Sequence, residues 1–186
     1  MISLKEAEKI LDQFLDNPNL KKHCLAVSSA MKAYAQQFGI TNPDEIEKWQ
    51  ISGLLHDADW EKYPDQHPKI IVDHLKKLNV DDDILNAILS HGFEFEEEPK
   101  TLMAKTLRAV DELTGLITAV ALVKGRKLDN VTVSSILNKW KDKRFASGVN
   151  REDIEKGAKD LNIPLEQHIE IVLSAMKTIK DKLGLN

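Results

Sequence analysis

The chain has 186 residues, of which 42% are hydrophobic and 30% are charged, so it can bury one sizeable core and is not a disordered protein. The formal net charge of -4 argues against a surface that coats nucleic acid, because binding to a phosphate backbone needs a concentrated positive face. The one cysteine, Cys24, excludes an internal disulfide, and the longest apolar run, 116–123, is far shorter than the roughly 20 residues that cross a bilayer.

The first two predicted elements are helices. Ser3 followed by Glu6 forms a capping box, and apolar residues at helical spacing then predict a helix that ends near residues 17–18. A second helix is predicted over 19–38, and Gly39 suits the left-handed conformation that ends a helix.

A third helix brings two chemically active side chains together. Asn42 and Pro43 supply its N-cap and its first position, and His56 and Asp57 stand at its end. The following stretch, 58–68, has two prolines and no sustained period, which predicts a loop that can contain a short turn of helix.

Further helices are predicted to the end of the chain. Their ranges are 69–78, 81–91, 101–123, 132–140, 150–161 and 164–183. The helix at 101–123 is apolar on most sides, which indicates a central position, and an exposed acidic connection at 94–98 precedes it. No run alternates as a strand would, so we predict an all-α fold of about eight to nine helices in a single domain, 1–186.

The charged first ten residues lack the apolar stretch of a signal peptide, and we expect a cytoplasmic location. Neither a nucleic-acid polymer nor a membrane is an expected partner. The oligomeric state is not defined by the sequence.

Six side chains are candidates for a metal centre. An imidazole and a carboxylate in neighbouring positions at a helix end can converge on one cation, and further candidates stand on or beside other helices. The full set is His23, His56, Asp57, His67, His91 and Asp111.

Asp111 is the most informative of these candidates. A carboxylate in a mostly apolar helix is costly unless it is paired or coordinates a metal, so a cationic group should meet it. That group is either a metal or a basic side chain such as Arg108, and this choice stays open.

These residues carry a family resemblance. The segment 54–68 (LLHDADWEKYPDQHP), with His23 upstream and the DELT stretch at 111–114, resembles the HD-domain superfamily of metal-dependent phosphohydrolases, whose signature is a spaced His, His-Asp, Asp set. The resemblance implies an HD-domain helical bundle with a motif core at about 20–125. A C-terminal helical extension then occupies about 130–186, of which 139–151 resembles a narrower, uncharacterised group of bacterial and archaeal HD proteins.

The resemblance also implies a ligand set. The ligands of a first metal would be His23, His56, Asp57 and Asp111. Subgroups with two metals add two histidines in the interval where His67 and His91 lie, so this chain resembles a dinuclear member with Asp57 bridging. With the first four ligands alone the centre would be mononuclear. Trp60 stands where HD proteins that hydrolyse cyclic dinucleotides often have a lysine, which argues against that activity.

Imidazole and carboxylate ligands suit one or two divalent transition ions (Fe, Mn, Zn, Co or Ni) better than calcium, and the absence of thiolates removes a structural zinc site. Two such ions activate a water and bind the attacking and leaving oxygens of an in-line displacement, which is the chemistry of phosphoester hydrolysis. The expected substrate is a small phosphorylated molecule. A nucleotide is favoured, and only the resemblance to the superfamily favours it.

Other charged residues are candidates for catalysis, ligand support or substrate binding beside the metals. Asp59 and Lys62 are predicted, with Asp57, to take part in catalysis, and Glu112 can support the last ligand. A basic cluster is predicted to hold a substrate phosphate, and it consists of Lys141, Lys143, Arg144 and Arg151. A solvated helix end would show the same pattern of basic residues. Cys24 is interpreted as a small packed side chain, and His74 and His168 are interpreted as structural or surface residues.

Three alternatives to a hydrolase stay open. The first is a non-catalytic metal-dependent module that binds or senses a nucleotide. The second is a helical interaction domain whose histidines are incidental. The third is a metal-dependent oxygenase, because some HD-fold proteins use a di-iron centre for that reaction.

Overall fold

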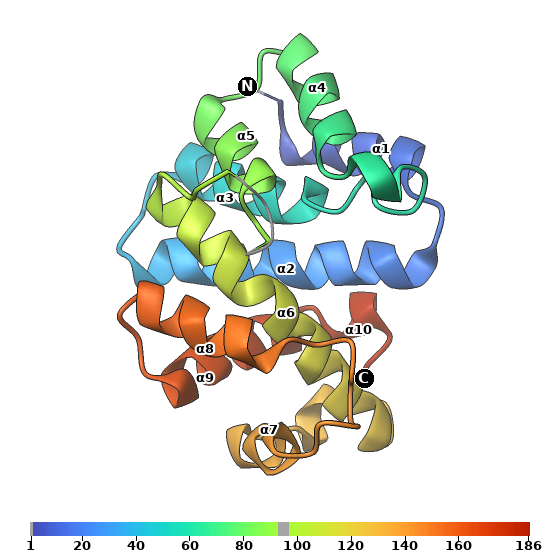
Figure 1. Cartoon of the computed structure of the whole chain (residues 1–186), viewed down its shortest axis with the longest axis vertical. Helices are drawn as coiled ribbons and strands as arrows, with labels where there is room; N and C mark the ends of the chain where they lie inside the picture. Colours follow the sequence, from blue (N-terminus) through green and yellow to red (C-terminus); the bar gives the residue numbers. More distant parts are fainter. Residues whose placement is uncertain (1, 93–96) are drawn as a thin grey trace.

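Figure 1 shows the computed structural model of the chain, which describes residues 2–92 and 97–186. In these ranges the chain forms ten α-helices and two short 3-10 helices and has no strand, which confirms the all-α prediction. The helices are α1 (Leu4–Phe14), α2 (Pro18–Gln37), α3 (Pro43–Leu55), α4 (Lys69–Lys77), α5 (Asp82–Leu89), α6 (Leu102–Val123), α7 (Val133–Trp140), α8 (Arg151–Asp160), α9 (Leu165–Thr178) and α10 (Lys180–Leu183), with η1 at Pro64–Gln66 and η2 at Leu128–Asn130. Most of the predicted connection at 94–98 lies outside the described residues.

The helix starts follow the local signals in the sequence. Ser3 and Glu6 form the predicted capping box of α1, and the side chain of Asn42 accepts the backbone N–H of Asp44 at the start of α3. The loop predicted at 58–68 contains the short helix η1. Side-chain caps satisfy backbone donors that have no partner inside the helix, which is why these starts could be predicted.

The prediction of one continuous helix over 164–183 is wrong. The chain leaves the helical conformation at Ile179, with φ -119° and ψ 17°, and this residue separates α9 from α10. The hydroxyl of Thr178 donates to the carbonyl of Ala175 at 2.7 Å, a local bond that competes with continuation of the helix. The predicted stop at Gly184 is present, with φ 68°.

The long helix α2 runs through the middle of the molecule (Figure 1). Helices α1 and α3–α5 lie on one side of it, α8 and α9 lie on the other, and α6 crosses it. One cluster of buried apolar side chains extends from Ala7 to Leu185, so the first and last helices contribute to the same core. The division into a motif core and a C-terminal extension stays a prediction.

Helices α2 and α3 approach closely at Gly53. A Cβ on this residue would lie 2.9 Å from the Cγ of Met31 and 2.9 Å from the backbone nitrogen of Ser28, so only glycine fits without movement. The hydroxyl of Ser28 also donates to the carbonyl of Gln50 at 2.9 Å. This close approach brings the end of α3 next to α2. In the part of the chain that the structure describes, no helix is both long and apolar enough to span a membrane.

Candidate metal centre

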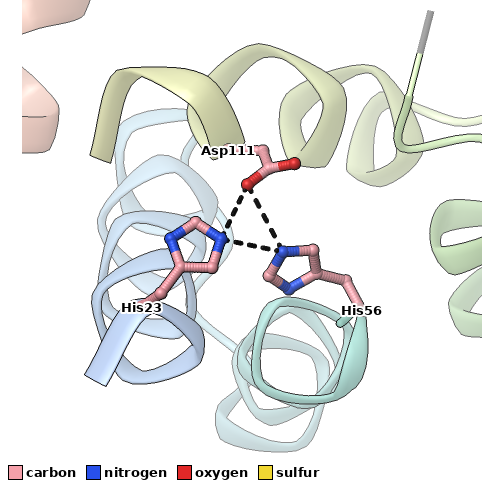
Figure 2. Close-up of side chains that lie close together, drawn as sticks. All are labelled: His23, His56 and Asp111. Carbon is pink, nitrogen blue, oxygen red and sulfur yellow. Dashed lines mark hydrogen bonds and ion pairs between the residues drawn. The ribbon is translucent and has the colours of Figure 1, made fainter. Parts of the chain in front are cut away.

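Three helices place one histidine–aspartate cluster at the centre of the bundle. Figure 2 shows His23 from α2 and His56 from the end of α3, both pointing toward Asp111 of α6. The Nε2 atoms of the two imidazoles are 3.2 Å apart. The Oδ1 atom of Asp111 lies 2.9 Å from Nε2 of His23 and 3.3 Å from Nε2 of His56.

Asp57 connects this cluster to a second one. Its Oδ2 atom lies 3.6 Å from Nε2 of His23 and 3.5 Å from Nε2 of His56. Its Oδ1 atom lies 3.4 Å from Nε2 of His67 and 3.5 Å from Nε2 of His91, and these two nitrogens are 3.2 Å apart. The structure thus gathers all six predicted ligands in one place, and two histidines face each oxygen of Asp57.

Two of the imidazoles are fixed by helix C-termini. The Nδ1 atom of His56 donates to the carbonyl of Gly53 at 2.9 Å, and Nδ1 of His91 donates to the carbonyl of Ile88 at 2.6 Å. These carbonyls lie in the last turns of α3 and α5, where backbone acceptors have no partner within the helix. The same helix ends carry partial negative charge, which favours a cation beside them.

The other two imidazoles are fixed by side chains. Nδ1 of His67 donates to Oδ1 of Asp59 at 2.7 Å, and the second oxygen of Asp59 accepts the backbone N–H of Ile71 at 2.9 Å. The hydroxyl of Thr114 donates to the carbonyl of Asp111 at 2.9 Å, so its lone pair can accept Nδ1–H of His23 at 3.2 Å. Each Nδ1 is therefore a donor, and each Nε2 presents its lone pair to the cluster.

This donor set fits divalent transition ions. Lone pairs of two Nε2 atoms repel each other at 3.2 Å unless a proton or a metal ion lies between them. For metal–ligand bonds of about 2.1 Å, neighbouring ligand atoms are about 3.0 Å apart in an octahedron and about 3.4 Å apart in a tetrahedron. The distances of 2.9 to 3.6 Å between donor atoms match these edges. Two overlapping groups of side chains could each hold an ion, namely His23, His56 and Asp111, and His56, Asp57 and His91.

The carboxylates of Asp57 and Asp111 keep their negative charge although only about a fifth of each side chain is exposed. Burial opposes ionisation, but the neighbouring imidazoles outweigh it and hold the pKa of Asp57 and of Asp111 well below the usual range. Burial of His56 would lower its pKa, yet the charges of Asp57 and Asp111 raise it to about 9. The centre therefore attracts positive charge.

Glu112 stands beside this centre on α6. Burial, followed by the charge of Asp111, raises the pKa of Glu112 to about 7. Its carboxylate accepts the backbone N–H of Asn150 at 3.1 Å and so ties the start of α8 to α6.

The structure separates the two loop residues that were predicted to take part in catalysis. Asp59 is fully buried and contacts a predicted ligand, His67. Lys62 instead donates from Nζ to the carbonyl of Gln13 at 3.1 Å and pairs with Asp16 at 3.0 Å. These contacts make Asp59 a positioning residue and join Lys62 to the connection between α1 and α2. A catalytic role for either stays a prediction.

The basic cluster is placed on the connection between α7 and α8. The guanidinium of Arg151 donates to backbone carbonyls of this connection, including that of Phe145 at 2.6 Å, and so holds its shape. The side chains of Lys141, Lys143 and Arg144 are exposed. Their predicted contact with a substrate phosphate stays a prediction.

The remaining expectations concern Asp111 and the structural residues. Asp111 meets imidazoles, while Arg108 donates to the carbonyls of Ser90 at 2.7 Å and Glu97 at 3.1 Å. Cys24 is fully buried, and burial raises the pKa of its thiol. His74 packs edge-on against Phe14. These positions agree with packing roles.

Two backbone contributors to the centre were missed in the sequence. The carbonyls of Gly53 and Ile88 orient two ligands, and backbone groups leave no residue-type signal. The spacing could have predicted these contacts, because each histidine stands at a helix end, three residues after the carbonyl that it contacts.

The fold and the centre define an all-helical protein with a histidine–aspartate cluster that could hold a metal. The chain belongs to the HD domain family, since the HD domain model matches residues 20–116. This family is generally one of metal-dependent hydrolases and gives the superfamily of metal-dependent phosphohydrolases its name. Comparisons with curated proteins and with solved structures gave no match.

Proposed function

We propose that this protein is a dinuclear metal-dependent phosphohydrolase that cleaves the phosphoester of a small molecule. The observation that carries the proposal is the position of Asp57, whose two oxygens each face a different pair of histidines. A single ion held by His23, His56 and Asp111 would leave His67 and His91 without a function. Membership of the HD domain family supports the choice of reaction.

The residues of the chain would share the work as follows. His23, His56 and Asp111 would hold one ion, and His67 with His91 would hold the other. Asp57 would bind both ions. Two divalent ions held there would supply an acidified water and stabilise the charge on the leaving oxygen.

The overall reaction is hydrolysis. An oxygen of water forms a bond to phosphorus, the ester P–O bond breaks, and the alcohol leaves with a proton from that water. The chain contributes by holding the ligands in register through Asp59, Thr114 and the helix ends of α3 and α5. Preorganised ligands need no rearrangement during the reaction.

The proposal is tested by metal content and turnover measured on the same samples. Untagged wild type, Asp57→Ala, His91→Ala and the control His74→Ala are loaded with Mn²⁺, Fe²⁺ or Zn²⁺ and dialysed. Elemental analysis should give close to two ions per chain for wild type and the control, and less for the other two variants. Hydrolysis of p-nitrophenyl phosphate should follow the metal content.

Other outcomes identify the competing functions. One ion that survives His91→Ala would contradict the dinuclear centre and favour a mononuclear enzyme. Two ions without turnover of any phosphoester in a screen would favour the non-catalytic binding module. Full activity in Asp57→Ala would contradict the site itself.

A further inference from the structure

A cavity opens beside the metal centre on the His23 side. It has a volume of about 410 Å³ and lies between the first turns of α2, the second half of α6 and the C-terminal residues. His23, a proposed ligand, forms part of its lining. Sites for small molecules have volumes of about 300 to 1,000 Å³, so this cavity can take the organic part of a small substrate.

The walls of the cavity combine apolar and cationic side chains. Leu122, Leu183 and Leu185 supply apolar surface, while Lys22 and Arg126 supply positive charge. None of the lining residues that the structure describes is a carboxylate. In a chain with a net charge of -4, a cavity with two cations and no acid is a local exception.

Both cations are available to a ligand. Across residues 2–92 and 97–186, neither Lys22 nor Arg126 forms an ion pair. Nζ of Lys22 passes over the C-terminal turn, where a Cβ on Gly184 would lie only 3.1 Å from it. Glycine at this left-handed position thus leaves room for the ammonium group.

The C-terminal wall is fixed in place. The backbone N–H of Leu128 donates to the carbonyl of Leu185 at 2.8 Å, and the N–H of Leu185 donates to the carbonyl of Lys180 at 3.0 Å. Leu183 and Leu185 are almost completely buried. The cavity is therefore formed before a ligand arrives.

The length of the cavity sets the reach of a ligand. Along α6, Thr118 lies seven residues and Leu122 eleven residues beyond Asp111, which corresponds to about 10 and 16 Å at 1.5 Å per residue. A group that contacts the far wall is therefore separated from the reacting phosphate by an extended organic body.

We infer that the substrate is a small phosphate ester with a largely apolar body and a second anionic group at its far end, which Lys22 and Arg126 bind. This inference rests on the proposed function, because it takes the metal centre as the place of the reacting phosphate. An ammonium or a guanidinium group binds phosphate or carboxylate oxygens by charge-assisted hydrogen bonds. An ester without the second anion fills the apolar walls but leaves both cations unused.

The test uses matched probes that do not react. Binding of hexylphosphonate and of hexane-1,6-bisphosphonate to the metal-loaded protein is measured by calorimetry. The wild type should bind the bisphosphonate about tenfold more tightly or better, beyond the twofold statistical advantage of two equivalent ends. Lys22→Gln and Arg126→Gln should each lose several-fold of this preference, and the double variant should lose all of it.

Neighbouring lysines supply the controls. Lys21→Gln and Lys127→Gln remove a charge next to each cation without touching the cavity lining, and both should keep the wild-type preference. A third probe, 6-phosphonohexanoate, distinguishes the kinds of anion: binding like the bisphosphonate indicates that a carboxylate suffices, and weaker binding indicates a second phosphate.

The outcomes separate this inference from the proposed function. Equal binding of the two phosphonates in wild type, or a preference that survives the double variant, would overturn the inference. Hydrolysis of hexyl phosphate without such a preference would support the proposed hydrolase and contradict a second anionic group in its substrate. A preference that the variants abolish, with no hydrolysis of hexyl phosphate or its bisphosphate, would support the cavity and contradict the hydrolase.

Discussion

The buried carboxylate of Asp59 holds the imidazole of His67 with one oxygen and the backbone of Ile71 with the other. Asn at position 59 keeps the shape but weakens the hold on Nδ1–H, because a neutral amide oxygen is a poorer acceptor than a carboxylate. We expect Asp59→Asn to lower metal affinity about 10- to 100-fold in the half of the centre that contains His67. Titration against a fluorescent chelator measures this loss.

Asp65→Asn is the matched control for this change. Asp65 lies in the same loop but is exposed, so its variant should bind metal like the wild type. A wild-type affinity in Asp59→Asn would show that His67 does not depend on this carboxylate.

Thr114 offers the corresponding test on the other half of the centre. Thr114→Val keeps the branched shape but removes the oxygen that lies 3.2 Å from Nδ1 of His23. The imidazole then loses the contact that orients Nε2, and we expect metal affinity in the half that contains His23 to fall about tenfold. The same titration applies, with Thr106→Val as the control, since that hydroxyl bonds only to its own helix at Leu102. Equal affinities in the two variants would contradict the orienting role.

Local signals in the sequence were sufficient for most of the helices but not for the site. Caps such as Asn42 act within one turn, so the start of α3 could be predicted, whereas the break at Ile179 had no comparable signal. The six candidate ligands could be named from their residue types and positions, and the family resemblance implied how they divide between two metals. The arrangement of four histidines around Asp57 depends on the packing of segments that are far apart in the chain, which no local pattern encodes.

The loop after Asp57 shows the same limit. Asp59 and Lys62 are close in sequence and both are charged. Only the geometry of the turn directs Asp59 toward His67 and Lys62 toward Asp16. The cavity beside His23 needs Lys22 and Arg126 together with the C-terminal leucines. These residues are far apart in sequence, so the cavity could not be predicted before the fold was known.

Gly157 tests how tightly α8 packs against the helix that carries Asp111. A Cβ at this position would lie 2.6 Å from Cα and 2.7 Å from Cβ of Ala109, so Gly157→Ala must push α8 and α6 apart. We expect a loss of about 2 kcal/mol in the free energy of unfolding, because the strain exceeds the gain of about 1 kcal/mol in helix propensity. Urea denaturation measures it. Gly148→Ala, with open space around the added methyl group, should change stability by less than about 0.5 kcal/mol, and similar losses in both variants would contradict the packing argument.

His168 gives the fold a dependence on pH that is separate from the metal centre. Its imidazole is buried, donates from Nε2 to the carbonyl of Ala109 at 3.0 Å and accepts the hydroxyl of Tyr34 at Nδ1. Burial, only partly offset by the bond to Ala109, lowers its pKa from 6.5 to about 4. Between these values the unfolded chain binds more protons, so stability is fully present above pH 6.5 and is lost as the pH falls toward 4. The loss amounts to about 3 kcal/mol at roughly 1.4 kcal/mol per pKa unit.

Urea denaturation of metal-free protein between pH 4 and 7.5 isolates this contribution. His168→Gln should be less stable than wild type at pH 7.5, and the difference should shrink as the pH falls, because the variant has no imidazole to protonate at that position. Tyr34→Phe is the control: it removes a partner of the imidazole but leaves it buried, and burial is the main cause of the shift, so this variant should keep the wild-type slope. If the curves of wild type and His168→Gln run parallel over the whole range, the buried imidazole does not control the acid stability of this fold.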